Sequence, residues 1–160
     1  MSETIGVVVF SFALAKNEPN PCNRRLAKIT TKIVLGATKI GTAILVAQWE
    51  VALGLHGVKP ELIVNRIADE YLDSEDVMER ASECFKNHNI TKVIVVANPF
   101  LHLYKCKKLA KQAGFEVLKQ KIPWVGFYRD SLQWWTRGPM RLFLYAILQA
   151  IGGQRGGGRE

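Results

Sequence analysis

The chain has 160 residues, of which 48% are hydrophobic and 22% charged, proportions typical of one globular domain with a real core. Its three cysteines show no CxxC spacing, which argues against a disulfide framework or a zinc site and favours a reducing compartment. The formal net charge of +8 favours anionic partners, such as phosphates, nucleotides or acidic lipids.

The first apolar stretch, residues 5–15, ends in Ala-Leu-Ala and faintly resembles a signal peptide. It follows Glu3 without a preceding Lys or Arg, whereas an export signal begins with basic residues. We therefore expect residues 5–12 to form a first core strand and the protein to be cytoplasmic. No apolar run approaches the ~20 residues that span a bilayer.

The first half of the chain alternates apolar runs with helical patterns. Residues 13–23 are rich in proline and asparagine, which predicts a loop. Apolar residues then recur at helical spacing. The predicted elements are a helix over 24–38, a strand over 42–47, a short helix over 50–56 that ends at Gly57, and a strand over 62–65.

An acidic segment leads into the second half. Seven of the fourteen acids lie between positions 69 and 83, and residues 66–73 read as an acidic loop. Ser74 has the chemistry of a helix N-cap, with acids in the first turn after it. The buried stripe of that helix is expected to contain Val77, Ala81, Cys84 and Phe85.

Residues 92–118 form the central strand, turn and helix of the predicted fold. They predict a buried strand over 93–97, a turn at Asn98, and a helix that carries His102 and Lys105 and ends at Gly114. A strand over 115–119, an aromatic-rich connection over 122–138 and a last helix over 140–151 started by Pro139 follow.

This alternation predicts an α/β fold: one Rossmann-like three-layer domain over residues 1–152, with a mostly parallel sheet of about five strands. The glycine-rich tail, residues 153–160, is expected to be disordered.

Ligands of open α/β sheets bind at the carboxyl ends of the strands, which singles out polar residues near those ends. His102 is the candidate acid/base group, and a surface or core histidine is the competing interpretation. The candidate ligand-binding residues are Ser11, Asn17, Arg24, Gln48, Glu50, Glu70, Ser74, Asn98 and Lys105. Arg24 and Lys105 would meet an anion, and Glu50 or Glu70 a hydroxyl or amine.

Familiar catalytic motifs are missing from the sequence: it has no GxGxxG, Walker loop, GxSxG or HExxH, and no Cys-His pair at metal spacing. No metal site or specific nucleic-acid motif is predicted. The last helix and its neighbouring tryptophans have two interpretations, contact with a membrane surface or packing in the core.

The order of these motifs resembles the YdcF/SanA/ElyC family. The matching segments are VVVFSFALAKNEPNPCNRRLAK, LVAQWEVALGLHGV, ADEYLDSEDVMERA and VIVVANPFLHLYKC. The family's glycine pairs are replaced by Ser11-Phe12 and Ala47-Gln48, and Lys105 stands in place of its arginine.

The resemblance implies a Rossmann-like domain that binds a nucleotide-like, S-adenosylmethionine-like or phosphorylated ligand at the strand ends. Transferase and hydrolase are the two candidate activities. Two alternatives remain open at this point. A non-catalytic interaction protein would fill the pocket with Phe12 and Trp49, and a peripheral membrane protein would use the final helix.

Overall fold

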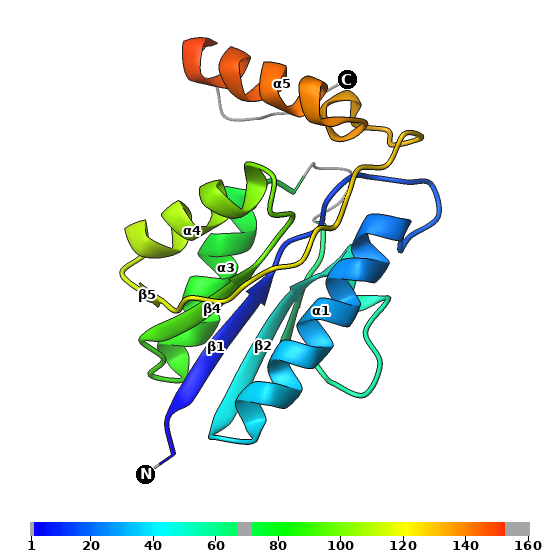
Figure 1. Cartoon of the computed structure of the whole chain (residues 1–160). Helices are drawn as coiled ribbons and strands as arrows, with labels where there is room; N and C mark the ends of the chain where they lie inside the picture. Colours follow the sequence, from blue (N-terminus) through cyan, green and yellow to red (C-terminus); the bar gives the residue numbers. More distant parts are fainter. Residues whose placement is uncertain (1, 67–71, 153–160) are drawn as a thin grey trace.

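The computed structural model of the protein describes residues 2–66 and 72–152. Its centre is a five-stranded, all-parallel sheet in the order β3-β2-β1-β4-β5 (Figure 1). This confirms the predicted Rossmann-like α/β fold. The strands are β1 (Thr4–Val9), β2 (Thr42–Gln48), β3 (Leu62–Val64), β4 (Lys92–Val96) and β5 (Glu116–Val117).

Helices flank the sheet on both faces and cover one of its ends. α1 lies on one face, α3 and α4 lie on the other, and α5 crosses above the carboxyl ends of the strands (Figure 1). The bounds are α1 (Pro21–Thr38), α2 (Trp49–Ala52), α3 (Ser74–Asn87), α4 (His102–Gln112), the short 3-10 helix η1 (Trp134–Thr136) and α5 (Pro139–Gly152).

The core is divided by the sheet into two apolar layers. On β1, Val7 and Val9 pack with α1, whereas Val8 packs with α3 and α4 on the opposite face. Both faces are covered, so Val7, Val8 and Val9 are apolar at consecutive positions rather than at alternate ones. Full burial of each such side chain contributes about 1.5–3 kcal/mol. Gly6 lets the sheet approach α3 closely, because a Cβ there would lie 2.9 Å from Cε1 of Phe85.

Helix α1 begins at Pro21, three residues before the predicted start, so the prediction that residues 13–23 form a loop throughout was wrong. Proline is tolerated in the first helical turn because the amide hydrogen it lacks would have no intrahelical partner. Asn20 caps the helix, since its side chain accepts a hydrogen bond of 3.1 Å from the amide of Asn23.

The N-cap of α3 is Asp73, not Ser74 as predicted. The Asp73 carboxylate accepts a 2.9 Å hydrogen bond from the amide of Asp76, and the Asp76 carboxylate accepts one of 3.2 Å from the amide of Asp73. This reciprocal pair is a capping box with aspartate in both roles. Ser74 is thereby the first residue of the helix, and its hydroxyl is available for other contacts.

Other predicted elements exist but have different lengths. The first and fifth strands were predicted too long, at 5–12 and 115–119, and α2 is only four residues long. Cys84 of the expected buried stripe on α3 is half-exposed. Gly114 does end α4 in the left-handed region, with φ of 96°, as predicted.

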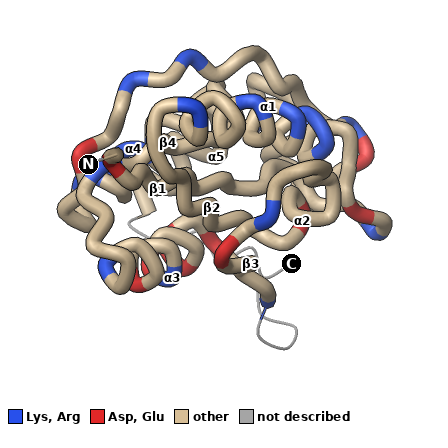
Figure 2. Tube along the Cα trace, turned by 90° about the horizontal axis from the view of Figure 1, so that it is seen from below, with Lys and Arg blue, Asp and Glu red and all other residues tan. Residues whose placement is uncertain are grey.

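Charge is distributed unevenly over this framework. Figure 2 shows basic positions along α1 and acidic positions on α3 and near β3. No helix in the described ranges is long and apolar enough to cross a membrane.

The capping box gives a stability prediction. Asp73→Ala should lower the free energy of unfolding by about 1 kcal/mol, because the amide of Asp76 loses its partner at the helix start. Ser74→Ala should cost less. Urea unfolding followed by circular dichroism measures both.

Asp73→Asn is the matched control, because an asparagine side chain caps a helix as well as aspartate does, and its stability should stay close to wild type. A larger loss for Ser74→Ala than for Asp73→Ala would contradict the assignment of the cap.

Candidate functional site

A cavity of about 150 Å³ lies at the carboxyl end of the sheet. Its walls come from the loop after β1, from the end of β2 and the first turn of α2, from Arg66 and Leu72, from the first turns of α3 and α4, and from η1 and α5. Six of the candidate residues from the sequence line it together: Ser11, Gln48, Glu50, Ser74, His102 and Lys105.

His102 and Ser74 are paired across this cavity. Nε2 of His102 lies 3.1 Å from Oγ of Ser74, and the rings of Phe10 and Phe12 lie about 6 Å from the imidazole. Burial lowers the pKa of His102 to about 4, and the positive charge of Lys105 adds to this effect. Within the described ranges Nδ1 has no hydrogen-bond partner. His102 is therefore a neutral imidazole at neutral pH.

Glu50 shows the opposite shift. It lies in the first turn of α2 and is buried, which raises its pKa to about 7 although its backbone and the Ser11 side chain hydrogen-bond to it. Its Oε2 has no hydrogen-bond partner among the described residues. At neutral pH this carboxyl group is thus close to half-protonated.

Two cations border the cavity. Nζ of Lys105 lies 3.7 Å from Oε1 of Glu75, so its charge is partly neutralised. Arg66 also lines the cavity, with its guanidinium 5.4 Å from the centre of the Trp49 ring. Sequence reasoning missed Arg66, although the same rule that selected Asn98 applies to it: Arg66 follows the end of β3 by two residues.

The loop after β1 is held in place by side-chain hydrogen bonds. Oδ1 of Asn23 accepts a 2.8 Å bond from the amide of Phe12, and the Glu18 carboxylate accepts bonds from the amides of Ala15 and Asn20. Gln48 accepts a 3.0 Å bond from the amide of Ser11. These contacts fix the backbone of residues 11–13 at the wall of the cavity.

Two residues at the cavity have strained backbones. Ala13 has φ of 65° and Leu101 has φ of 60°, a region that non-glycine residues rarely occupy. Each such residue costs about 1–3 kcal/mol, and strain of this kind clusters at functional sites.

The remaining wall comes from the chain's last segment. Tyr145 stacks on Trp135 with ring centres 4.5 Å apart, and its hydroxyl accepts a 2.7 Å hydrogen bond from Gln149. Leu142 is buried beside them. None of these cavity residues was a candidate from the sequence, because an apolar helical pattern does not reveal which part of the sheet the helix covers.

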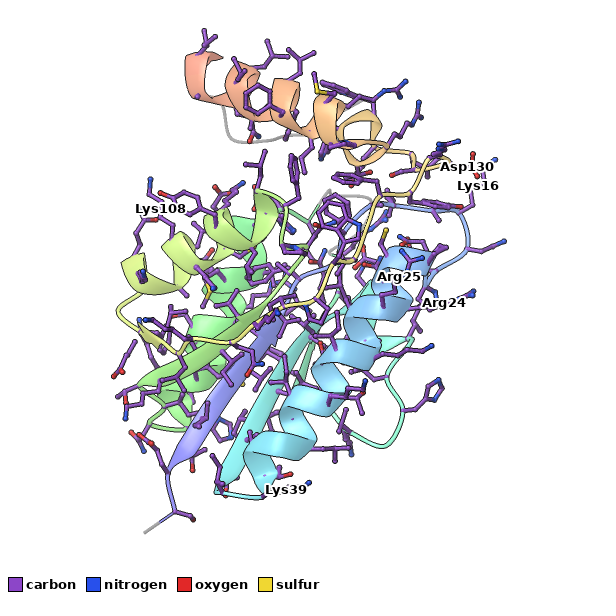
Figure 3. The ribbon with its side chains drawn as sticks, in the orientation of Figure 1. Lys16, Arg24, Arg25, Lys39, Lys108 and Asp130 are labelled. Carbon is purple, nitrogen blue, oxygen red and sulfur yellow. The ribbon has the colours of Figure 1, made fainter. Side chains whose placement is uncertain are left out.

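Four candidates do not take part in this arrangement. Asn98 is fully buried, donates a 2.7 Å hydrogen bond to the carbonyl of Gly126 and accepts one from the amide of Phe100. Asn17 is exposed and does not line the cavity. Arg24 is also exposed, on the outer side of α1 (Figure 3). Glu70 lies outside the described residues.

Comparisons with models of known protein families, with curated proteins and with solved structures find no match. Among the described residues, no group of three or more His, Cys, Asp or Glu side chains is arranged to hold a metal ion.

The shifted pKa of Glu50 gives a pH-dependent prediction. The folded state keeps the Glu50 proton up to about pH 7, whereas the unfolded state loses it near the ordinary glutamate pKa of 4.5. Stability associated with this group is therefore present below pH 4.5 and is lost as the pH rises through 7. Glutamine carries no proton that titrates, so Glu50→Gln avoids this loss. The free energy of unfolding of the variant, relative to that of wild type, should rise between pH 5 and 8 by at most about 3 kcal/mol.

Melting temperatures of both proteins across this pH range test the prediction. Glu79→Gln, at an exposed position of α3, is the matched control for the same change of side chain outside the cavity, and its melting temperature should stay close to wild type. A flat difference for Glu50→Gln would mean that the carboxyl group is solvated.

Proposed function

We propose that the protein binds a small phosphorylated metabolite that also carries hydroxyl or amine groups. The observation that carries the proposal is the convergence of Glu50, Ser74, His102 and Lys105 on one cavity at the carboxyl end of a parallel sheet. These side chains come from α2, α3 and α4, which are far apart in the sequence.

The volume of the cavity favours a small ligand. Pockets for drug-sized molecules enclose about 300–1,000 Å³, whereas this cavity has about 150 Å³. A nucleotide or an S-adenosylmethionine-like molecule would need α5 to move away. Among the ligands that the resemblance implies, a small phosphorylated metabolite fits without such a movement.

The charges favour a ligand of mixed polarity. Lys105 and Arg66 supply positive charge to the cavity, while Asp73 and Glu50 supply carboxyl groups. A phosphate group would contact the cations, and hydroxyl or amine groups of the same ligand would contact Glu50. A purely anionic ligand would leave the buried Oε2 of Glu50 without a partner, at a cost in binding free energy.

The two shifted pKa values distribute the acid/base roles. A general acid or base works best with a pKa near the working pH, a condition that Glu50, at about 7, meets in the free protein. In the free protein, His102 is a neutral hydrogen-bonding group. A bound phosphate next to Lys105 would oppose the effect of that cation and raise the pKa of His102. Transferase or hydrolase chemistry is compatible with this pair.

Two further observations support a ligand site. The strained backbones of Ala13 and Leu101 both lie at the cavity. Phe12 packs against Phe127 at the wall and leaves the cavity open, whereas an interaction protein without a ligand would fill it.

We also propose kinship with the YdcF/SanA/ElyC family. What supports it is the parallel five-stranded sheet together with Glu50 and His102 at the ends of the second and fourth strands. This chain lacks the glycine pairs of the family, and the larger residues in their place are consistent with a narrower site than a nucleotide requires.

A thermal-shift screen tests the binding proposal. The panel contains inorganic phosphate, sugar phosphates, phosphorylated amino acids, nucleotides and adenosyl compounds. A ligand present at 100 times its Kd stabilises the folded state by about 2.7 kcal/mol and should raise Tm by roughly 5–10 °C. We expect a small phosphorylated compound to give the largest shift, and Lys105→Gln to weaken its binding roughly tenfold or more, because a charged hydrogen bond is lost.

Lys108→Gln is the matched control. Lys108 lies on the outer side of α4 (Figure 3), so this variant should bind like wild type. His102→Ala should also weaken binding. The proposal fails if no compound shifts wild type, or if the two lysine variants bind a hit equally well.

A further inference from the structure

Helix α5 has apolar side chains on two opposite faces. Its inner face, with Leu142 and Tyr145, closes the cavity. Its outer face is exposed to solvent, with Met140 at 78% and Ile151 at 79% of full exposure. The outer face as a whole consists of Met140, Phe143, Leu144, Ile147, Leu148 and Ile151.

This outer face is unusual for a protein surface. The helix contains no acidic residue and one base, Arg141, in fourteen residues. A helix that is apolar all round is normally buried in a core or in a membrane environment, and a large exposed apolar patch marks an interaction site. α5 is too short to cross a bilayer, which takes about 20 residues. It is long enough to lie in the plane of a membrane surface.

Aromatic residues and charge indicate which partner covers it. Trp134 contacts Tyr145 of this helix and is 38% exposed, and tryptophan is enriched at membrane interfaces. Residues 124–152 contain three arginines and one acid, Asp130. Lys16 and Asp130 are both drawn toward the end of the molecule where α5 begins (Figure 3).

This combination complements an anionic lipid surface. Basic side chains bordering an apolar face attract acidic headgroups, whereas two copies of a chain with a formal net charge of +8 repel each other. We propose that the outer face of α5 docks the protein on anionic membranes, with the helix in the plane of the interface. This inference does not depend on the identity of the cavity's ligand.

Vesicle flotation tests the proposal with the full chain. Wild type should float with vesicles of mixed phosphatidylcholine and phosphatidylglycerol, and more weakly with phosphatidylcholine alone. Leu144→Gln combined with Ile151→Gln should lower the partition coefficient roughly tenfold or more, because two apolar side chains no longer enter the interface. Arg141→Gln should lower binding to the mixed vesicles roughly fivefold.

Matched controls lie at the opposite end of the molecule. Ile40, 78% exposed after α1, and Lys39 beside it (Figure 3) provide Ile40→Gln and Lys39→Gln, which should float like wild type. Circular dichroism checks that each variant is folded, and the single variant Ile151→Gln replaces the double variant if the latter unfolds.

Two outcomes would overturn the proposal. One is that wild type does not float with either kind of vesicle, or that folded variants of α5 float as well as wild type does. The other is wild type that light scattering shows to be a dimer, which the α5 substitutions convert to a monomer without changing flotation. That result would assign the face to a second copy of the chain.

Discussion

The position of β1 between β2 and β4 is the constraint on which the rest of the structure depends. β1 pairs in parallel with both neighbours, and the chain reverses its direction of strand addition at this point. The helix after β1 therefore packs on one face and the helix after β4 on the other (Figure 1). Their connecting loops separate above the sheet and leave a crevice. The amide of Phe10 still bonds to the carbonyl of Val96 at 2.9 Å, so the crevice opens directly beyond a continuous sheet.

Polar groups around this crevice divide into those that hold the loops and those that lack protein partners. Buried side chains hold the loops by hydrogen bonds to the backbone, namely those of Asn20, Asn23 and Gln48. The polar groups that make these bonds are not free to bind a ligand. Within the described residues, four buried side-chain atoms have no partner: Trp49 Nε1, Glu50 Oε2, Glu75 Oε2 and His102 Nδ1. All four belong to the first turns of α2, α3 and α4. Unsatisfied buried polar atoms are costly, and two of the four, Glu50 Oε2 and His102 Nδ1, belong to residues that line the cavity.

The sequence predicted the sheet well because its strands are short apolar runs between strong helical patterns. Its candidates Glu50 and His102 both line the cavity, because the topology brings strand ends and the helices after them to one edge of the sheet. It failed where the position depends on contacts distant in sequence. Asn98 follows a strand as His102 does, yet its amide holds Gly126. No periodicity in α5 reveals that Tyr145 faces the cavity, because the helix is apolar on both faces.

The acid/base properties of the candidate site depend on α5, a helix that the sequence predicted but whose place over the cavity it did not reveal. Desolvation is the largest cause of both shifts, raising the pKa of Glu50 and lowering that of His102. The walls that keep water from these groups include Leu142, Tyr145 and Gln149 of α5. A cavity without α5 would be better solvated, and both pKa values would return toward their ordinary range. A carboxyl group poised near neutral pH therefore requires more than a strand end and a glutamate. It also requires a covering helix whose inner face is apolar enough to exclude water.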